Sequence, residues 1–186
     1  MIVRIVALVL LVVLAGCGQH VEPSGLPAEQ RFGAPFPAAP RDVRPASVDP
    51  CRSLLTPAEL RELGFDPTGD LATLPTGEMS CDWRGLRRVP HVNVGVAGDR
   101  DILVDTYRTR QFTIFRPTSI GGLPATVEQA SHDSISCNVT VGTAQGQGFL
   151  TIYDGVFNAR GQPDNPCGKA QQIAERIVAA LPPLSK

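Results

Sequence analysis

Cysteines are the residues in this chain whose types and spacing most clearly suggest chemistry. Cys17 ends the segment Leu14-Ala15-Gly16-Cys17, which closes an apolar run that starts at Ile5. Small residues before a cysteine let a peptidase approach the backbone closely, and a thiol can act as the nucleophile that accepts a diacylglyceryl group. We therefore predict that Cys17 is a site of lipid attachment.

The first 16 residues have the layout of an export signal, with one basic residue, Arg4, before about ten apolar residues. As a helix, this run would cover roughly 16 Å, about half of a ~30 Å hydrocarbon core, so it is short for a membrane span. The segment resembles the bacterial lipobox. The resemblance implies that residues 1–16 are removed and that Cys17 becomes the lipidated first residue, held by two or more acyl chains. The alternative is an ordinary cleaved secretory signal with a chance cysteine.

Four further cysteines belong to the part of the chain that would be exported to an oxidising compartment, where disulfides are the default. They are Cys51, Cys81, Cys137 and Cys167, and none of them forms the C-x-x-C pair typical of zinc sites. Three pairings are formally possible. We favour Cys51–Cys81 with Cys137–Cys167, because each bridge would join a helix N-terminus to a strand across a similar length of chain. Spacing alone leaves the pairing open.

Histidines give a weaker signal. His20 lies in a proline-rich segment, His91 on the outward side of a predicted strand, and His132 in the polar turn 131–134. A catalytic triad needs side chains that converge in space, whereas neighbouring side chains on a turn point apart. The sequence also lacks the G-x-S-x-G, H-E-x-x-H, P-loop and dinucleotide-binding patterns. We predict that the protein is not an enzyme, and we assign it no catalytic, cofactor-binding or metal-binding residue.

Two charged clusters have simple interpretations. An acidic metal loop would need ligands where apolar residues 102–104 stand, so acids at a helix N-terminus explain the first cluster better. It comprises Asp99, Asp101 and Asp105. The second cluster lies at a predicted hairpin tip, where a solvated turn is favoured over contact with anionic lipid headgroups or an acidic partner. It comprises Arg84, Arg87 and Arg88.

Overall charge narrows the classes of partner. The chain has 17 Lys plus Arg against 18 Asp plus Glu, a formal net charge of −1. A nucleic-acid-binding protein normally has a strong basic excess, so we predict no nucleic-acid partner.

The elements that must position these residues follow from hydrophobic periodicity. A proline-rich stretch, residues 17–48, has no periodicity and predicts a flexible tether between the lipid and a single domain at 49–186. Helices are predicted at 57–63, 101–110 and 166–181, and strands at 80–84, 92–96, 112–116, 126–129, 137–141 and 149–153. We therefore predict an α+β fold, an antiparallel sheet with an N-terminal and a C-terminal helix packed on one face, with two disulfides.

Several short motifs, in order along the chain, carry a family resemblance. They are Asp49-Pro50-Cys51, residues 54–60 (LLTPAEL), Cys81-x-Trp83, residues 122–125 (GLPA), Cys137, and Pro166-Cys167 before the last helix. The chain resembles a family of small secreted actinobacterial lipoproteins, the domain of unknown function 3558, and is similar to mycobacterial lipoproteins of the Lpr type. The resemblance implies a lipid anchor on the outer face of the cytoplasmic membrane and a disulfide-bearing α+β domain. It transfers no catalytic residue.

These observations lead to one functional hypothesis and two alternatives. We predict a non-catalytic binding or interaction domain in the cell envelope, anchored to the membrane through Cys17, with an unidentified protein or small-molecule ligand. The first alternative is a carrier of an apolar molecule or lipid, which requires a sizeable apolar cavity between sheet and helices. The second is a cryptic hydrolase, which requires a histidine within hydrogen-bond reach of a serine or aspartate inside a cleft.

Overall fold

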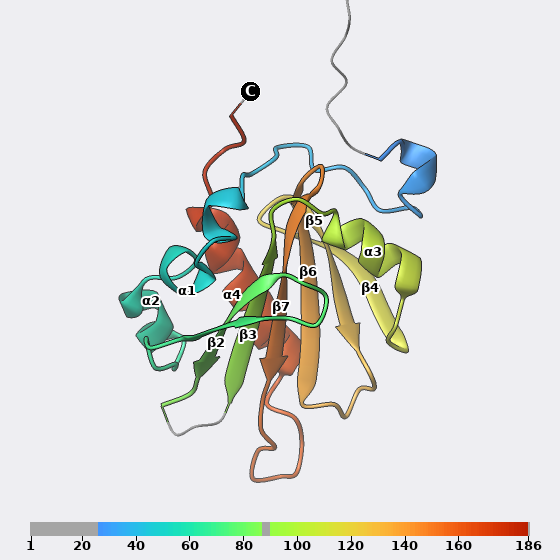
Figure 1. Cartoon of the computed structure of the whole chain (residues 1–186). Helices are drawn as coiled ribbons and strands as arrows, with labels where there is room; N and C mark the ends of the chain where they lie inside the picture. Colours follow the sequence, from blue (N-terminus) through green and yellow to red (C-terminus); the bar gives the residue numbers. More distant parts are fainter. Residues whose placement is uncertain (1–25, 87–89, 186) are drawn as a thin grey trace, which may run out of the picture.

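A computed structural model of the chain describes residues 26–86 and 90–185 (Figure 1). A seven-stranded sheet with strand order β1-β2-β3-β7-β6-β5-β4 forms its centre, and every neighbouring pair of strands is antiparallel. The strands are β1 (Asp70–Thr73), β2 (Met79–Arg84), β3 (His91–Ala97), β4 (Ile114–Ile120), β5 (Leu123–Gln129), β6 (Ser136–Ala144) and β7 (Gln147–Asp154). The helices are α1 (Pro50–Ser53), α2 (Pro57–Glu62), α3 (Ile102–Thr109) and α4 (Pro166–Ala180). The predicted α+β class is confirmed.

The main hydrophobic core lies between the sheet and α4. The Asn165 side chain caps this helix by accepting a hydrogen bond from the Gly168 amide at 3.2 Å. Ile173 and Ile177 are at most 1% exposed, as the apolar periodicity of residues 170–181 predicts. They pack with the inward residues of the central strands, among them Trp83, Val94, Val139, Phe149 and Tyr153.

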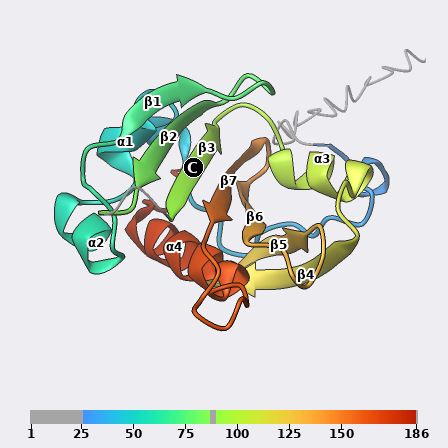
Figure 2. The same cartoon turned by 90° about the horizontal axis from the view of Figure 1, so that it is seen from below.

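Helix α3 packs on the opposite face of the sheet, which differs from the predicted arrangement with helices on one face (Figure 2). On β6, Val139 and Val141 belong to the α4 core, whereas the intervening Thr140 meets Thr106 of α3, with 3.4 Å between their hydroxyl oxygens. A Cβ on Gly142 would lie 2.9 Å from Leu103 of α3. Glycine in these strands therefore lets α3 approach the second face closely.

Both disulfides have the favoured pairing. Cys51–Cys81 joins α1 to β2, and Cys137–Cys167 joins β6 to the first turn of α4. The Cα atoms of each pair are 5.0 Å apart, within the range that disulfides need. Each bridge thus connects a helix N-terminus to a strand on the α4 side of the sheet.

Residues 26–48 pack on the domain, and we call them the N-terminal strap. Arg31 is 2% exposed and Val43 is fully buried. The Arg41 amide donates to the Thr143 carbonyl at 2.8 Å, and the Asp42 amide donates to the Pro182 carbonyl at 2.9 Å. The prediction of a flexible tether is therefore wrong for this part of residues 17–48, because main-chain hydrogen bonds and buried side chains hold it. Cys17 lies outside the described residues, so the prediction for residues 17–25 stays open.

Candidate functional site

The face of the sheet opposite α4 is lined by polar side chains. Antiparallel register places Asp82, Asn93, Ile152, Asn138 and Glu128 next to one another in a row from β2 to β5. Register partners share a face, and this face alternates with the apolar one that contacts α4. The strands thus present a hydrophobic side toward α4 and, away from it, a side on which polar residues stand beside apolar ones such as Ile152.

A cavity of about 300 Å³ lies between α3 and this polar face, and we call it the α3 cavity. The sheet contributes Glu128, Asn138, Thr140 and Leu150, and the tip of the β1–β2 hairpin contributes Thr76. The remaining lining residues come from α3 and the segments next to it, namely Arg100, Ile102, Asp105, Thr106, Arg108, Thr109, Gln111 and Phe112. Segments far apart in the sequence therefore build this cavity together.

Glu128 is the unusual residue of the α3 cavity. It is only 6% exposed, and burial raises the pKa of its carboxyl from 4.5 to about 7. Its cross-strand neighbours on the same face are Phe115 and Asn138, neither of which is charged. Within residues 26–86 and 90–185, its side chain has neither a hydrogen bond nor an ion pair, whereas buried carboxylates normally have both.

The other charged residues around the α3 cavity are paired. Arg100 forms ion pairs with Glu78 and with Asp105, the latter at 3.1 Å. Asp105 also pairs with Arg108 at 2.7 Å. These four charges balance one another, so the carboxyl of Glu128 is the uncompensated charge of this cavity among the described side chains.

A second cavity of about 610 Å³ adjoins the first and shares Thr76 and Arg100 with it. Arg44 and Ser47 of the N-terminal strap form one side. The other lining residues come from the β1–β2 hairpin, the end of β3 and the loop after it, namely Gly77, Glu78, Met79, Val96, Ala97, Gly98 and Asp99. The strap therefore borders the region that leads to the α3 cavity.

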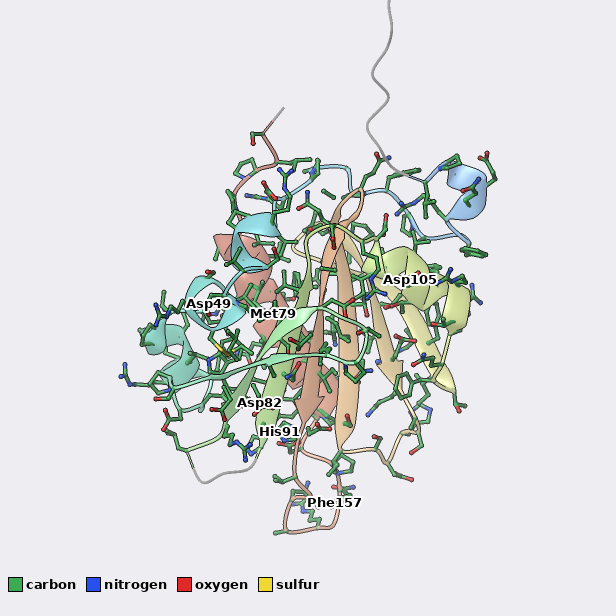
Figure 3. The ribbon with its side chains drawn as sticks, in the orientation of Figure 1. Asp49, Met79, Asp82, His91, Asp105 and Phe157 are labelled. Atoms are coloured by element: carbon green, nitrogen blue, oxygen red, sulfur yellow. A yellow bond between two sulfur atoms is a disulfide. The ribbon has the colours of Figure 1, made fainter. Side chains whose placement is uncertain are left out.

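His91 has a carboxylate partner but does not lie in either cavity. Its Nε2 is 3.0 Å from Oδ2 of Asp154, and the two side chains are 41% and 32% exposed. Figure 3 shows Asp82 on β2 and His91 at the start of β3, away from Asp105 on α3. His132 is exposed in the turn before β6. The hydrolase alternative requires a histidine that is paired with an acid or serine inside a cleft. His91 has such a partner, but the pair does not line either cavity.

The structure tests the interpretation of the acidic cluster before α3 more fully than that of the arginine cluster after β2. Asp101 caps α3 by accepting from the Val104 amide at 3.3 Å, and Asp105 lies in the first turn, so the helix N-terminus interpretation is confirmed for both. Among the described residues, no three His, Cys, Asp or Glu side chains are grouped so that they could hold a metal ion. Arg84 is paired with Asp82 and Asp70, while Arg87, Arg88, Cys17 and His20 lie outside the described residues.

Sequence reasoning missed Glu128 as a site residue. One signal was present, because this acid lies in the strand predicted at 126–129, and the structure buries every residue of Leu123–Gln129. An acidic residue in a buried strand normally has either an oppositely charged or hydrogen-bonding partner or a role in function. The sequence could not show that the partner is absent, since that depends on which side chains α3 brings to the cavity.

Together these features define a disulfide-bearing α+β domain with a cavity of mixed polar and apolar lining on the sheet face that α3 covers. Residues 12–180 match the family described as "Protein of unknown function (DUF3558)", and the chain belongs to this family. Neither the curated proteins nor the solved structures contain a match to the chain. Of the helices that the structure describes, none is both long enough and apolar enough to cross a membrane.

Proposed function

We propose that the protein is a lipid-anchored lipoprotein of the cell envelope whose domain binds a small polar molecule in the α3 cavity. The observation that carries the binding role is Glu128, a residue 6% exposed whose carboxyl has no hydrogen-bond or ion-pair partner among the described residues and which lines a cavity of about 300 Å³. A buried ionisable group in a cleft is typical of functional sites, because leaving it unpaired costs stability. The volume is at the lower end of the range for small-molecule sites.

The anchoring part of the proposal depends on Cys17. An apolar run after Arg4 and small residues before Cys17 support export and lipid attachment at the outer face of the cytoplasmic membrane. The two disulfides fit an oxidising compartment. The resemblance inferred from the sequence motifs, to small secreted actinobacterial lipoproteins of the Lpr type, would imply the same location.

The carrier alternative receives less support from the cavities described above. Charged and hydroxyl side chains contribute to the lining of both, although Val96, which lines the larger one, also belongs to the apolar core that α4 covers. An apolar ligand would leave Glu128 buried without a partner, which is unfavourable. A small polar ligand fits this lining better.

Ligand-observed NMR on the full chain, purified in detergent from membranes, tests the binding role. The probes are neutral, cationic and anionic fragments of up to roughly 20 non-hydrogen atoms, a size in keeping with the cavity. Asn138→Phe fills the α3 cavity, and Gln172→Phe is the matched control on the exposed side of α4. We expect fragments that bind the wild type and the control but not Asn138→Phe. Equal binding to all three proteins, or no bound fragment, would contradict the binding role.

Mass spectrometry tests the anchor independently. We expect residue 17 of the membrane-fraction protein to carry a diacylglyceryl group, and Cys17→Ala to leave the membrane fraction. An unmodified thiol at residue 17 would refute the anchor without affecting the binding role.

A further inference from the structure

Resting on the binding function proposed above, we infer that the ligand of the α3 cavity carries a positively charged amino or amidino group that pairs with Glu128. The inference concerns the chemical class of the ligand. It follows from three features of the cavity, which are its unpaired carboxyl, the balance of its other charges, and its apolar lining.

The unpaired carboxyl is the first feature. Glu128 is 6% exposed, and its same-face neighbours Phe115 and Asn138 supply no positive charge. A carboxylate that is removed from water is stabilised by a cation that also donates hydrogen bonds to it. A ligand ammonium or amidinium supplies both the charge and the donors, which a neutral or anionic ligand does not.

The balance of the surrounding charges is the second feature. Arg100, Asp105 and Arg108 line the cavity from α3 and the loop before it, and Glu78 pairs with Arg100 from the β1–β2 hairpin. On the β4 side, Arg110 lies over the ring of Phe115, 4.9 Å from its centroid. Each of these arginines therefore already has a carboxylate or an aromatic partner. Glu128 is therefore the group in this cavity with which a positively charged ligand can form an ion pair.

The apolar lining is the third feature. Ile102, Phe112 and Leu150 face the same cavity as Glu128. A short hydrocarbon part beside the charged group would cover these side chains and exclude water from the ion pair. Exclusion of water strengthens the attraction between the two charges. A small organic cation therefore fits better than a hydrated metal ion, for which a single carboxylate is a poor set of ligands.

A matched set of four-carbon probes tests the inference on the full chain. Butylamine carries the charge, while butanol and butyrate have the same chain length without it, and calorimetry or saturation-transfer NMR measures each affinity. We expect butylamine to bind more tightly than the other two. Glu128→Gln should weaken butylamine at least tenfold, whereas Glu175→Gln, on the exposed side of α4, should bind like the wild type.

The dependence on pH provides a second readout. Butylamine stays protonated from pH 6 to 8, as a lysine side chain does. The Glu128 carboxyl, with its pKa near 7, changes from mostly protonated to mostly ionised over the same range. The affinity of butylamine should therefore rise about tenfold in the wild type and stay constant in Glu128→Gln.

Three outcomes would overturn the inference. They are equal affinity for butylamine and butanol, no loss in Glu128→Gln, and no binding of butylamine. If butanol or butyrate binds the wild type and Asn138→Phe abolishes that binding, the inference fails while the proposed function stands.

Discussion

Replacing Glu128 by glutamine should stabilise the protein at alkaline pH. The folded-state pKa of this carboxyl is about 7, against 4.5 for the unperturbed group. Because the folded value is the higher one, the folded protein holds a proton that the unfolded chain has already released between these pH values. The free energy of unfolding contributed by Glu128 is therefore present below about pH 4.5 and is lost as the pH rises through 7.

The magnitude follows from the two pKa values. Their difference corresponds to about 3 kcal/mol, since each pKa unit is about 1.4 kcal/mol. The cavity is open to water, which screens the buried charge, so we expect about 2 kcal/mol. Glutamine has nearly the same shape and no charge. Glu128→Gln should therefore exceed the wild type in free energy of unfolding by about 0.5 kcal/mol at pH 5, where most of the unfolded carboxyl has already ionised, and by about 2 kcal/mol at pH 8.

Urea denaturation at pH 5 and pH 8, with both disulfides intact, measures this difference. All other groups titrate equally in both proteins. The difference in free energy of unfolding between the two proteins therefore changes from pH 5 to pH 8 only through residue 128. Glu175→Gln, which removes an exposed carboxyl from α4, should run parallel to the wild type. A Glu128→Gln profile parallel to the wild type would refute the reasoning, because it would mean that the native carboxyl is solvated or paired.

Three further predictions concern the scaffold around the cavity. Arg31→Leu should lower the free energy of unfolding by about 3 kcal/mol, because it leaves the carboxylate of Asp101, 2.6 Å away, buried without its partner. Adding Asp101→Asn should recover most of this loss in urea denaturation, since asparagine still caps α3; equal losses in the single and double variants would contradict a specific pair. Cys137→Ser with Cys167→Ser should cost about 3–4 kcal/mol by calorimetry, and a cost below about 1 kcal/mol would argue against stabilisation by loop closure. Thr56→Ala should cost about 1 kcal/mol in thermal melts because it removes the hydroxyl that caps α2, whereas Thr56→Ser should remain near the wild type.

Local patterns predicted α2, α3 and α4 closely, whereas the four-residue α1 (Pro50–Ser53) was not predicted. Thr56 and Glu59 predict a capping box, and both of its hydrogen bonds are present at the start of α2. The apolar stripe of α4 and its proline at the first turn gave a helix at 166–181, close to Pro166–Ala180. These elements are decided by residues within a few positions of one another, so the sequence carries their signal directly.

Strands at the edges of the sheet were harder to predict. β1 (Asp70–Thr73) was missed because its four residues are all exposed and show no alternation. Strands were predicted at 112–116 and 126–129, yet β4 continues to Ile120 and only Gly121 and Gly122 connect it to β5. Pro117 lies within β4, where an edge strand tolerates the missing donor. In each case the neighbouring strand, rather than the local sequence, decides the outcome.

The N-terminal strap shows the same limit for a longer segment. Its prolines and lack of periodicity are typical of a linker, but Val43 is buried and its amide donates to the Gln147 side chain at 3.0 Å. Arg31 reaches the N-terminus of α3, 70 positions further along the chain. Composition describes the local preference of such a segment, whereas the contacts that hold it come from distant residues.

The treatment of buried charge in this fold gives the strongest reason to place a ligand at Glu128. Among the described residues, three charged residues are buried as a whole, namely Arg31, Glu78 and Glu128. Arg31 is paired with Asp101, and Glu78 is paired with Arg100. In both pairs, an oppositely charged side chain compensates the buried charge. At Glu128 the cross-strand neighbours are the uncharged Phe115 and Asn138. The ionised carboxyl therefore lowers the stability of the fold, which a glutamine would not do. Such a cost is typical of residues kept for function, and a cationic ligand would complete the third pair.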